Sequence, residues 1–204
     1  MATSRTATDI LRQSLNLMLV PALIILSSLP QWADVGRDIS TQASTETNLL
    51  VPIGFAFSIW GPIFLGNIVY ALYQALPRQG ARDIHRRIGW WTATGFTGTA
   101  GWAFFTSFAP IEWKDWGSAL VFIPAALSLV IAMLILTHRR AELTTLDRWI
   151  VWRPISVMAG WMSIAQFLNF NTTLMPYFTD WGWSETGSSL MMLGLALWYV
   201  SFFV

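Results

Sequence analysis

The chain has 204 residues, of which 54% are hydrophobic and only 11% are charged, and its mean hydropathy is +0.51. A soluble domain carries about 25% charged residues, and here the shortfall falls in long uncharged runs, which are typical of membrane-spanning helices. The absence of Cys excludes disulfides, thiolate metal sites and cysteine nucleophiles. These properties predict an all-α polytopic transmembrane helix bundle that forms a single domain over residues 1–204.

Six apolar segments are long enough to span a membrane, at about residues 14–30, 51–77, 88–109, 116–137, 154–175 and 187–204. The first segment contains Pro21 and is followed by a polar connection, 33–49, which is the longest loop and a candidate lid over the membrane surface. Short basic loops precede the third and fifth segments, and short acidic loops precede the fourth and sixth.

The basic residues are distributed unevenly between the two sides that six spans create. Ten of them lie in the N-terminal segment and the two basic loops, whereas the three alternate loops carry Arg37 and Lys114. The positive-inside rule places the ten in the cytoplasm. We therefore expect a cytoplasmic N-terminus, a cytoplasmic C-terminus and an external 33–49 loop.

The predicted spans contain no Asp, Glu, Lys, Arg or His. Ion-coupled transporters usually need an ionisable group within the membrane, and hydrolytic or redox enzymes need acid–base pairs, metal ligands or nucleophiles. The sequence therefore predicts no catalytic residue, no metal site and no enzymatic activity. His85 and His138 fall in the basic loops, where we expect solvated side chains and not ligands of a haem or chlorophyll.

Nine of the thirteen tryptophans lie at predicted span ends, where indole rings anchor in the headgroup region. Trp60, Trp102 and Trp161 fall deeper, where an indole N–H needs a hydrogen-bond partner. On a helix, Trp161, Ala165 and Asn169 form one stripe because they are four residues apart. An amide side chain within the membrane, such as that of Asn169, either bonds to a neighbouring helix or lines an aromatic pocket for a large flat ligand. The stripe favours the pocket.

Three glycines, Gly95, Gly98 and Gly101, recur at three-residue spacing in the third segment. Small residues in this pattern allow another helix to approach closely. Packing within the monomer is the favoured interpretation, and a homodimer face is the alternative.

Two motifs resemble the tryptophan-rich TspO/MBR proteins, whose animal members are the peripheral-type benzodiazepine receptor or translocator protein. The second segment reads P-I-G-F-A-F-S-I-W-G-P-I-F at 52–64, which is similar to the F-S-I-W-G form of the longer TspO-related bacterial proteins. The fifth segment matches the family pattern Pro…Trp-x-x-x-Ala-x-x-Leu-Asn at Pro154, Trp161, Ala165, Leu168 and Asn169. A weaker match to Trp-x-x-Phe-Phe begins at Trp102.

The resemblance implies a five-helix core, here with one additional C-terminal helix, that binds tetrapyrroles, sterols or aromatic drug-like ligands beneath the first extramembrane loop. It implies ligand-binding roles for Phe57, Trp60, Trp102, Trp161, Ala165, Leu168 and Asn169. The 33–49 loop lacks the family's Lys-Pro-x-Trp-x-Pro-Pro motif, and Gly101 stands where the family has Asn. The ligand is therefore unknown: a porphyrin, a bacteriochlorophyll, a carotenoid and a lipid are candidates, and the sequence requires none of them.

The leading hypothesis is a TspO-like protein of a bacterial inner membrane that binds a hydrophobic aromatic or tetrapyrrole-like ligand and acts as a sensor or carrier. The alternative is a non-catalytic accessory subunit of a larger membrane complex, such as a photosynthetic pigment–protein assembly. It is motivated by the missing loop motif and the wholly apolar last segment. Expected partners are membrane lipids and either a second copy or such a complex, but no nucleic acid.

Overall fold

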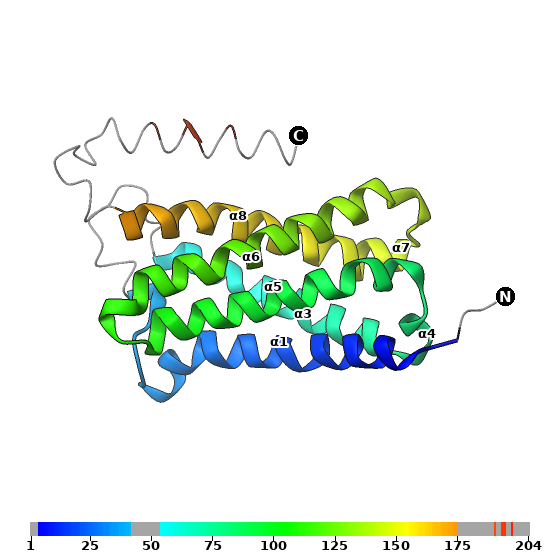
Figure 1. Ribbon diagram of the computed structural model, residues 1–204, viewed down its shortest axis with the longest axis horizontal. Coiled ribbons are helices and arrows are strands. Elements are labelled where there is room, and N and C mark those ends of the chain that lie inside the picture. The colour runs from blue at the N-terminus through cyan, green and yellow to red at the C-terminus, as the bar shows by residue number, and fades with distance from the viewer. Residues whose placement is uncertain (1–3, 42–53, 175–189, 191–192, 195–196, 198–204) are drawn as a thin grey trace.

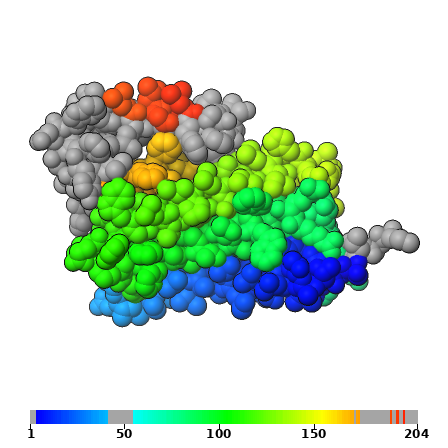
Figure 2. All heavy atoms as spheres, in the orientation of Figure 1, coloured from blue at the N-terminus to red at the C-terminus, as the bar shows by residue number. Residues whose placement is uncertain are grey.

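The computed structural model describes residues 4–41 and 54–174, together with residues 190, 193, 194 and 197. Within these ranges the chain is helical and contains no strand, which confirms the all-α prediction. Five long helices in these ranges run lengthwise beside one another (Figure 1): α1 (Ala7–Ala33), α3 (Trp60–Ala75), α5 (Asp83–Phe108), α6 (Ile111–His138) and α8 (Arg153–Leu174). On the face shown in Figure 2, atoms of α1, α5 and α6 lie at the surface in that order from bottom to top.

Short helical turns connect the long helices. They are η1 (Gly54–Ile59), α4 (Pro77–Gly80), η2 (Arg140–Glu142), α7 (Thr145–Asp147) and η3 (Arg148–Trp152). The two basic loops predicted from the sequence are therefore largely helical, because α4 and the first turn of α5 occupy the first loop and η2, α7 and η3 occupy the second.

Three of the described helical segments are long and apolar enough to cross a membrane: Ala7–Ala33, Phe55–Ala75 and Ile111–His138. The helices α5 and α8 match the predicted third and fifth spans in position but do not reach the same apolarity. The sixth predicted span, 187–204, lies outside the described residues except at four single positions. The structure thus supports a helical membrane protein.

The helices α5 and α6 approach each other most closely at two of the predicted glycines. A Cβ atom on Gly95 would lie 2.6 Å from the Leu129 side chain, and one on Gly98 would lie 2.6 Å from the Ala125 Cβ atom. Both distances are too short for two carbon atoms, so each position needs a residue without a side chain. Gly101 is less constrained, since its nearest neighbour, Val121, is 3.8 Å away. Gly95 and Gly98 therefore serve helix packing within the chain.

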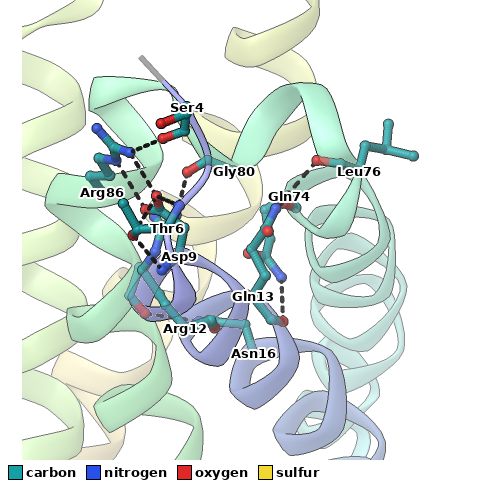
Figure 3. A network of polar contacts seen from close by, with 11 residues as sticks. Ser4, Thr6, Asp9, Arg12, Gln13, Asn16, Gln74, Leu76, Gly80 and Arg86 are labelled. Carbon is teal, nitrogen blue, oxygen red and sulfur yellow. Dashed lines mark hydrogen bonds and ion pairs between the residues drawn. The ribbon is translucent and has the colours of Figure 1, made fainter.

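A buried polar network joins α1, α4 and α5 at the end of the bundle that carries the basic loops (Figure 3). Helix α1 begins seven residues before the predicted span because Thr6 and Asp9 form a capping box. Arg12, which is 1% exposed, bonds to the Asp9 carboxylate at 3.2 Å and to the Gly80 carbonyl at 2.7 Å. Arg86 donates two further bonds to Asp9, at 2.6 and 2.9 Å. Two arginines from different helices therefore share one buried carboxylate.

Buried amides continue this network towards the middle of the bundle. Gln13 and Gln74 each donate from the side chain to the other residue's main-chain carbonyl, which links α1 to α3. Asn16 donates to the Gly89 carbonyl at 2.8 Å and accepts a bond from Thr92 at 2.7 Å, which links α1 to α5. These hydrogen bonds satisfy buried amide, hydroxyl and carbonyl groups that would otherwise need water as a partner.

A second buried ion pair, between Arg82 and Asp147, fastens α7 to the start of α5. The guanidinium contacts both carboxylate oxygens, at 2.7 and 2.6 Å, and the Asp147 side chain is fully buried. Tyr73 of α3 donates a third bond to this carboxylate at 2.9 Å. The pair therefore holds three elements together at the basic end.

The prediction of a solvated His85 is wrong. Helix α5 begins at Asp83, earlier than the predicted span, so His85 faces the interior, is 1% exposed and packs beside the rings of Tyr70 and Tyr73. His138, in contrast, is exposed at the end of α6, where its Nδ1 donates to the Leu134 carbonyl at 2.8 Å.

Candidate ligand-binding site

Four of the predicted ligand-binding residues form one aromatic cluster at the end of the bundle opposite the basic loops. Trp60, the first residue of α3, stacks on Trp102 of α5 with ring centroids 6.1 Å apart and planes at 21°. Trp161 of α8 meets Trp60 edge-on at 6.2 Å. Phe57 of η1 also meets Trp161 edge-on, at 6.3 Å. Edge-on and offset-stacked pairs at these separations are favourable arrangements of aromatic rings.

The local backbone explains why Phe57 and Trp60 reach the same cluster. They are three residues apart, and η1 is a 3-10 helix in which side chains at this spacing lie one above the other. The described part of the second predicted span, 51–77, therefore begins with a 3-10 turn over Gly54–Ile59 that continues into α3.

Two further rings belong to the cluster and were not predicted. Phe64 packs against Trp60 at a centroid distance of 5.3 Å, and Phe122 of α6 meets Trp102 edge-on at 5.3 Å. Phe64 could have been found, since it follows Trp60 by one helical turn. Phe122 could not, because nothing in the sequence distinguishes it from other apolar residues of its segment.

A cavity of about 80 Å³ adjoins the cluster between α1, η1 and α5. It is lined by Ser27, Ser28, Gln31, Asp38, Ile39, Phe57, Trp60, Phe64 and Trp102. Burial would raise the pKa of Asp38, but hydrogen bonds from Ser40 and Thr41 lower it to about 2. One wall of the cavity is thus aromatic, and the other carries hydroxyl, amide and ionised carboxylate groups.

Arg37 holds the segment that contains Asp38 against the end of α5. Its guanidinium donates to the carbonyls of Thr106 at 3.1 Å and Ala109 at 2.6 Å, and its main-chain N–H donates to Ser107 at 2.9 Å. These carbonyls end the helix without an intrahelical partner, and a cation there also interacts favourably with the helix dipole. The sequence predicted only that Arg37 lies on the external side, and no local pattern indicated this role.

The neighbouring Gly36 allows the same close approach. Its φ angle is +76°, and a Cβ atom there would lie 2.6 Å from the Ser107 carbonyl oxygen. A residue with a side chain would therefore separate this segment from α5.

The remaining predicted residues continue along α8. Ala165 packs against the core, and Leu168 is half-buried. The Asn169 Oδ1 atom accepts a bond from Ser118 of α6 at 3.3 Å. The predicted stripe therefore contacts two different neighbours, since Trp161 meets α3 and η1 whereas Asn169 meets α6.

Several buried polar atoms near this end form no hydrogen bond with any described residue. They are Trp161 Nε1, Asn169 Nδ2, Ser27 Oγ, Thr106 Oγ1, Ser107 Oγ, and Nε2 and Oε1 of Gln166. Buried polar groups are nearly always bonded, and leaving one unbonded costs about 1–3 kcal/mol. Of the residues that carry these atoms, Ser27 lines the cavity. Among the described residues, no group of three His, Asp or Glu side chains could hold a metal ion.

The helical fold, the apolar helices and the indole cluster together define a tryptophan-rich helical membrane protein. A family model described as TSPO-like protein matches residues 13–204, so the chain belongs to this family, as its two motifs indicated. No curated protein and no solved structure matches the chain.

Proposed function

We propose that the protein binds a hydrophobic aromatic or tetrapyrrole-like ligand beside Trp60, Trp102 and Trp161, and acts as a sensor or carrier in a bacterial inner membrane without catalysing a reaction. In this proposal six helices cross the membrane with both termini in the cytoplasm, so the cluster lies near the outer surface. The TSPO-like family membership supports the part of this proposal that describes a TspO-like membrane protein.

The observation that carries the proposal is the unbonded indole N–H of Trp161. This group is buried and has no hydrogen-bond partner among the described residues, although the ring itself contacts Trp60 and Phe57. A flat aromatic ligand with a polar acceptor would satisfy both features, because its face packs on indole rings and its acceptor receives the N–H.

The size of the cavity determines how such a ligand enters. A volume of about 80 Å³ admits a few water molecules or the end of a larger molecule. A tetrapyrrole is much larger, so its binding requires some rings to move. Trp102 and Phe122 are buried, whereas Phe57 and Trp60 are half-buried, so the movement falls to η1 and the start of α3.

Porphyrin titration of the purified full chain in detergent tests the proposal. The absorption band of protoporphyrin IX reports binding independently of the number of tryptophans, and tryptophan quenching provides a second signal. We expect saturable binding that weakens about tenfold in Trp161→Phe, which keeps a ring but loses the N–H bond. Trp90→Phe is the matched control, because Trp90 is exposed on α5 and lies at the basic end.

Two results would overturn the proposal. One is the absence of saturable binding to the unaltered protein, and the other is equal affinity in the unaltered protein, Trp161→Phe and Trp90→Phe.

A further inference from the structure

A groove of about 570 Å³ runs between α5 and α6 at the basic end of the bundle, away from the aromatic cluster. The two helices lie next to each other on the face shown in Figure 2. The floor of the groove is apolar and consists of Trp91, Ile131, Leu134 and Ile135. Its rim is formed by Arg87, His138 and Arg139. The groove thus combines an apolar channel with a basic opening.

The two arginines of the rim are held in place by one carboxylate. Arg87 Nε and Arg139 Nη1 both bond to Asp83 Oδ2, at 2.6 and 3.0 Å. The bond from Arg87 lowers the pKa of Asp83, so this carboxylate stays ionised. Asp83 therefore brings guanidinium groups from two helices to the same point.

Both arginines retain donors for a further anion. Arg87 binds Asp83 through Nε, and Arg139 binds Asp83 and Glu142 through Nη1. The two Nη groups of Arg87 and the Nη2 group of Arg139 form no hydrogen bond with other described residues. Guanidinium groups with free Nη donors suit a phosphate, which offers several acceptor oxygens.

The charge of this end of the bundle also favours an anion. Its loops and helix ends carry ten arginines but only four carboxylates, Asp9, Asp83, Glu142 and Asp147, which leaves a formal charge of +6 with neutral histidines. An anionic headgroup would therefore approach a basic surface even though Asp83 and Glu142 neutralise part of the rim.

The order of residues along the helices matches the shape of a phospholipid. Trp91 follows Arg87 by one turn of α5, and Leu134 precedes His138 by one turn of α6, so apolar side chains begin about 6 Å from the charges. Trp91 is 39% exposed, which suits an indole at the headgroup level. The groove therefore offers charges at one level and an apolar channel at the next, which match the charged headgroup and the acyl chains of a glycerophospholipid.

We propose that this groove binds one anionic glycerophospholipid, with its phosphate between Arg87 and Arg139 and an acyl chain along Trp91, Ile131 and Ile135. Asp83 is a positioning residue, since it aligns the two guanidinium groups without contacting the lipid. The site is independent of the aromatic cluster, and its occupant is a lipid of the surrounding membrane.

Native mass spectrometry of the delipidated full chain tests this proposal with phosphatidylglycerol and phosphatidylcholine of identical acyl chains. We expect one phosphatidylglycerol to be retained at about a tenfold lower lipid concentration than phosphatidylcholine. The double variant Arg87→Gln/Arg139→Gln should lose this preference. The control Arg5→Gln/Arg78→Gln removes the same charge from two exposed positions and should keep it.

A variant of the floor tests the acyl contact without changing any charge. Ile135→Trp fills the channel and should weaken retention of both lipids, whereas porphyrin binding at the opposite end should be unchanged. Inorganic phosphate at millimolar concentration should not displace phosphatidylglycerol, because it lacks the acyl chain. Displacement by phosphate, equal retention of the two lipids by the unaltered protein, or equal loss of preference in both double variants would overturn the proposal.

Discussion

Trp60 stacks on Trp102, with their ring centroids 6.1 Å apart and their planes inclined by 21°. The two rings come from different apolar segments, and Trp60 also meets Trp161 of a third segment at 6.2 Å. Trp102 is 7% exposed and is backed by Phe122. Trp60 therefore contributes ring contacts from α3 to both α5 and α8 beside the cavity.

Replacing Trp60 by Leu removes both of these ring contacts. We expect a loss of about 2–4 kcal/mol in the free energy of unfolding, because a large ring leaves space that Leu does not fill. Thermal unfolding in detergent measures this loss. Trp32→Leu, at a position that is 71% exposed, should lower the midpoint much less. Equal shifts in the two variants would show that the cluster does not stabilise the fold.

Replacing Arg37 by Met keeps an unbranched side chain but removes its bonds to the end of α5. We expect a loss of about 1–2 kcal/mol, since helix-ending carbonyls lose a charged donor. Hydrogen exchange should become faster in the residues around Ala109. Arg78→Met, at an exposed position in α4, is the control and should leave exchange around Ala109 unchanged.

Replacing Asp9 by Asn leaves two arginines without their carboxylate. Arg12 is 1% exposed, so its charge would keep only the bond to the Gly80 carbonyl. Breaking a buried ion pair in this way costs about 3–5 kcal/mol. Asp83→Asn also removes a carboxylate that binds two arginines, but it is exposed and should cost less than about 1 kcal/mol. A comparison of the two unfolding midpoints decides whether burial causes the difference.

The Asp147 carboxylate should make stability depend on acid pH. Burial would raise its pKa, but bonds from Arg82, Thr144 and Tyr73 outweigh burial and hold the pKa well below its usual range. The folded pKa is thus lower than the unfolded pKa of about 4. The resulting stability is fully present above the unfolded pKa and is lost as the pH falls through the folded pKa.

The corresponding measurement is the unfolding midpoint between pH 6 and pH 3. We expect a fall below pH 4 in the unaltered protein and a smaller fall in Asp147→Asn, which starts from a lower midpoint. Identical pH profiles for the two proteins would contradict the assignment.

Replacing His85 by Phe should change the free energy of unfolding by less than about 1 kcal/mol. Neither ring nitrogen has a hydrogen-bond partner among the described residues, so no bond is lost, while the contacts with Tyr70 and Tyr73 can be kept. Asn16→Leu is the contrast, because Asn16 bonds to Gly89 and Thr92. A strong effect of His85→Phe would instead indicate a ligand or buried water at the imidazole.

The helices and several residues of the candidate site could be predicted because the sequence carries direct signals for them. Uncharged runs give the long helices, and deeply placed tryptophans with the two motifs indicate Trp60, Trp102 and Trp161. The buried network of Asp9, Arg12 and Arg86 could not be predicted in this way, because isolated charges near a chain end are usually solvated. Its burial depends on α4 and α5 covering the first turns of α1.

The close packing at Gly95 and Gly98 has a consequence for motion. Since α5 and α6 leave no room there for even a methyl group and are joined through Ala109 and Pro110, they form a closely packed hairpin. If the protein acts as the proposed sensor, a conformational change at the aromatic cluster would reach the basic end by sliding or rotation of α3 and α8 across this hairpin. In such a change, α5 and α6 would keep their relative position, and α3 and α8 would move relative to them.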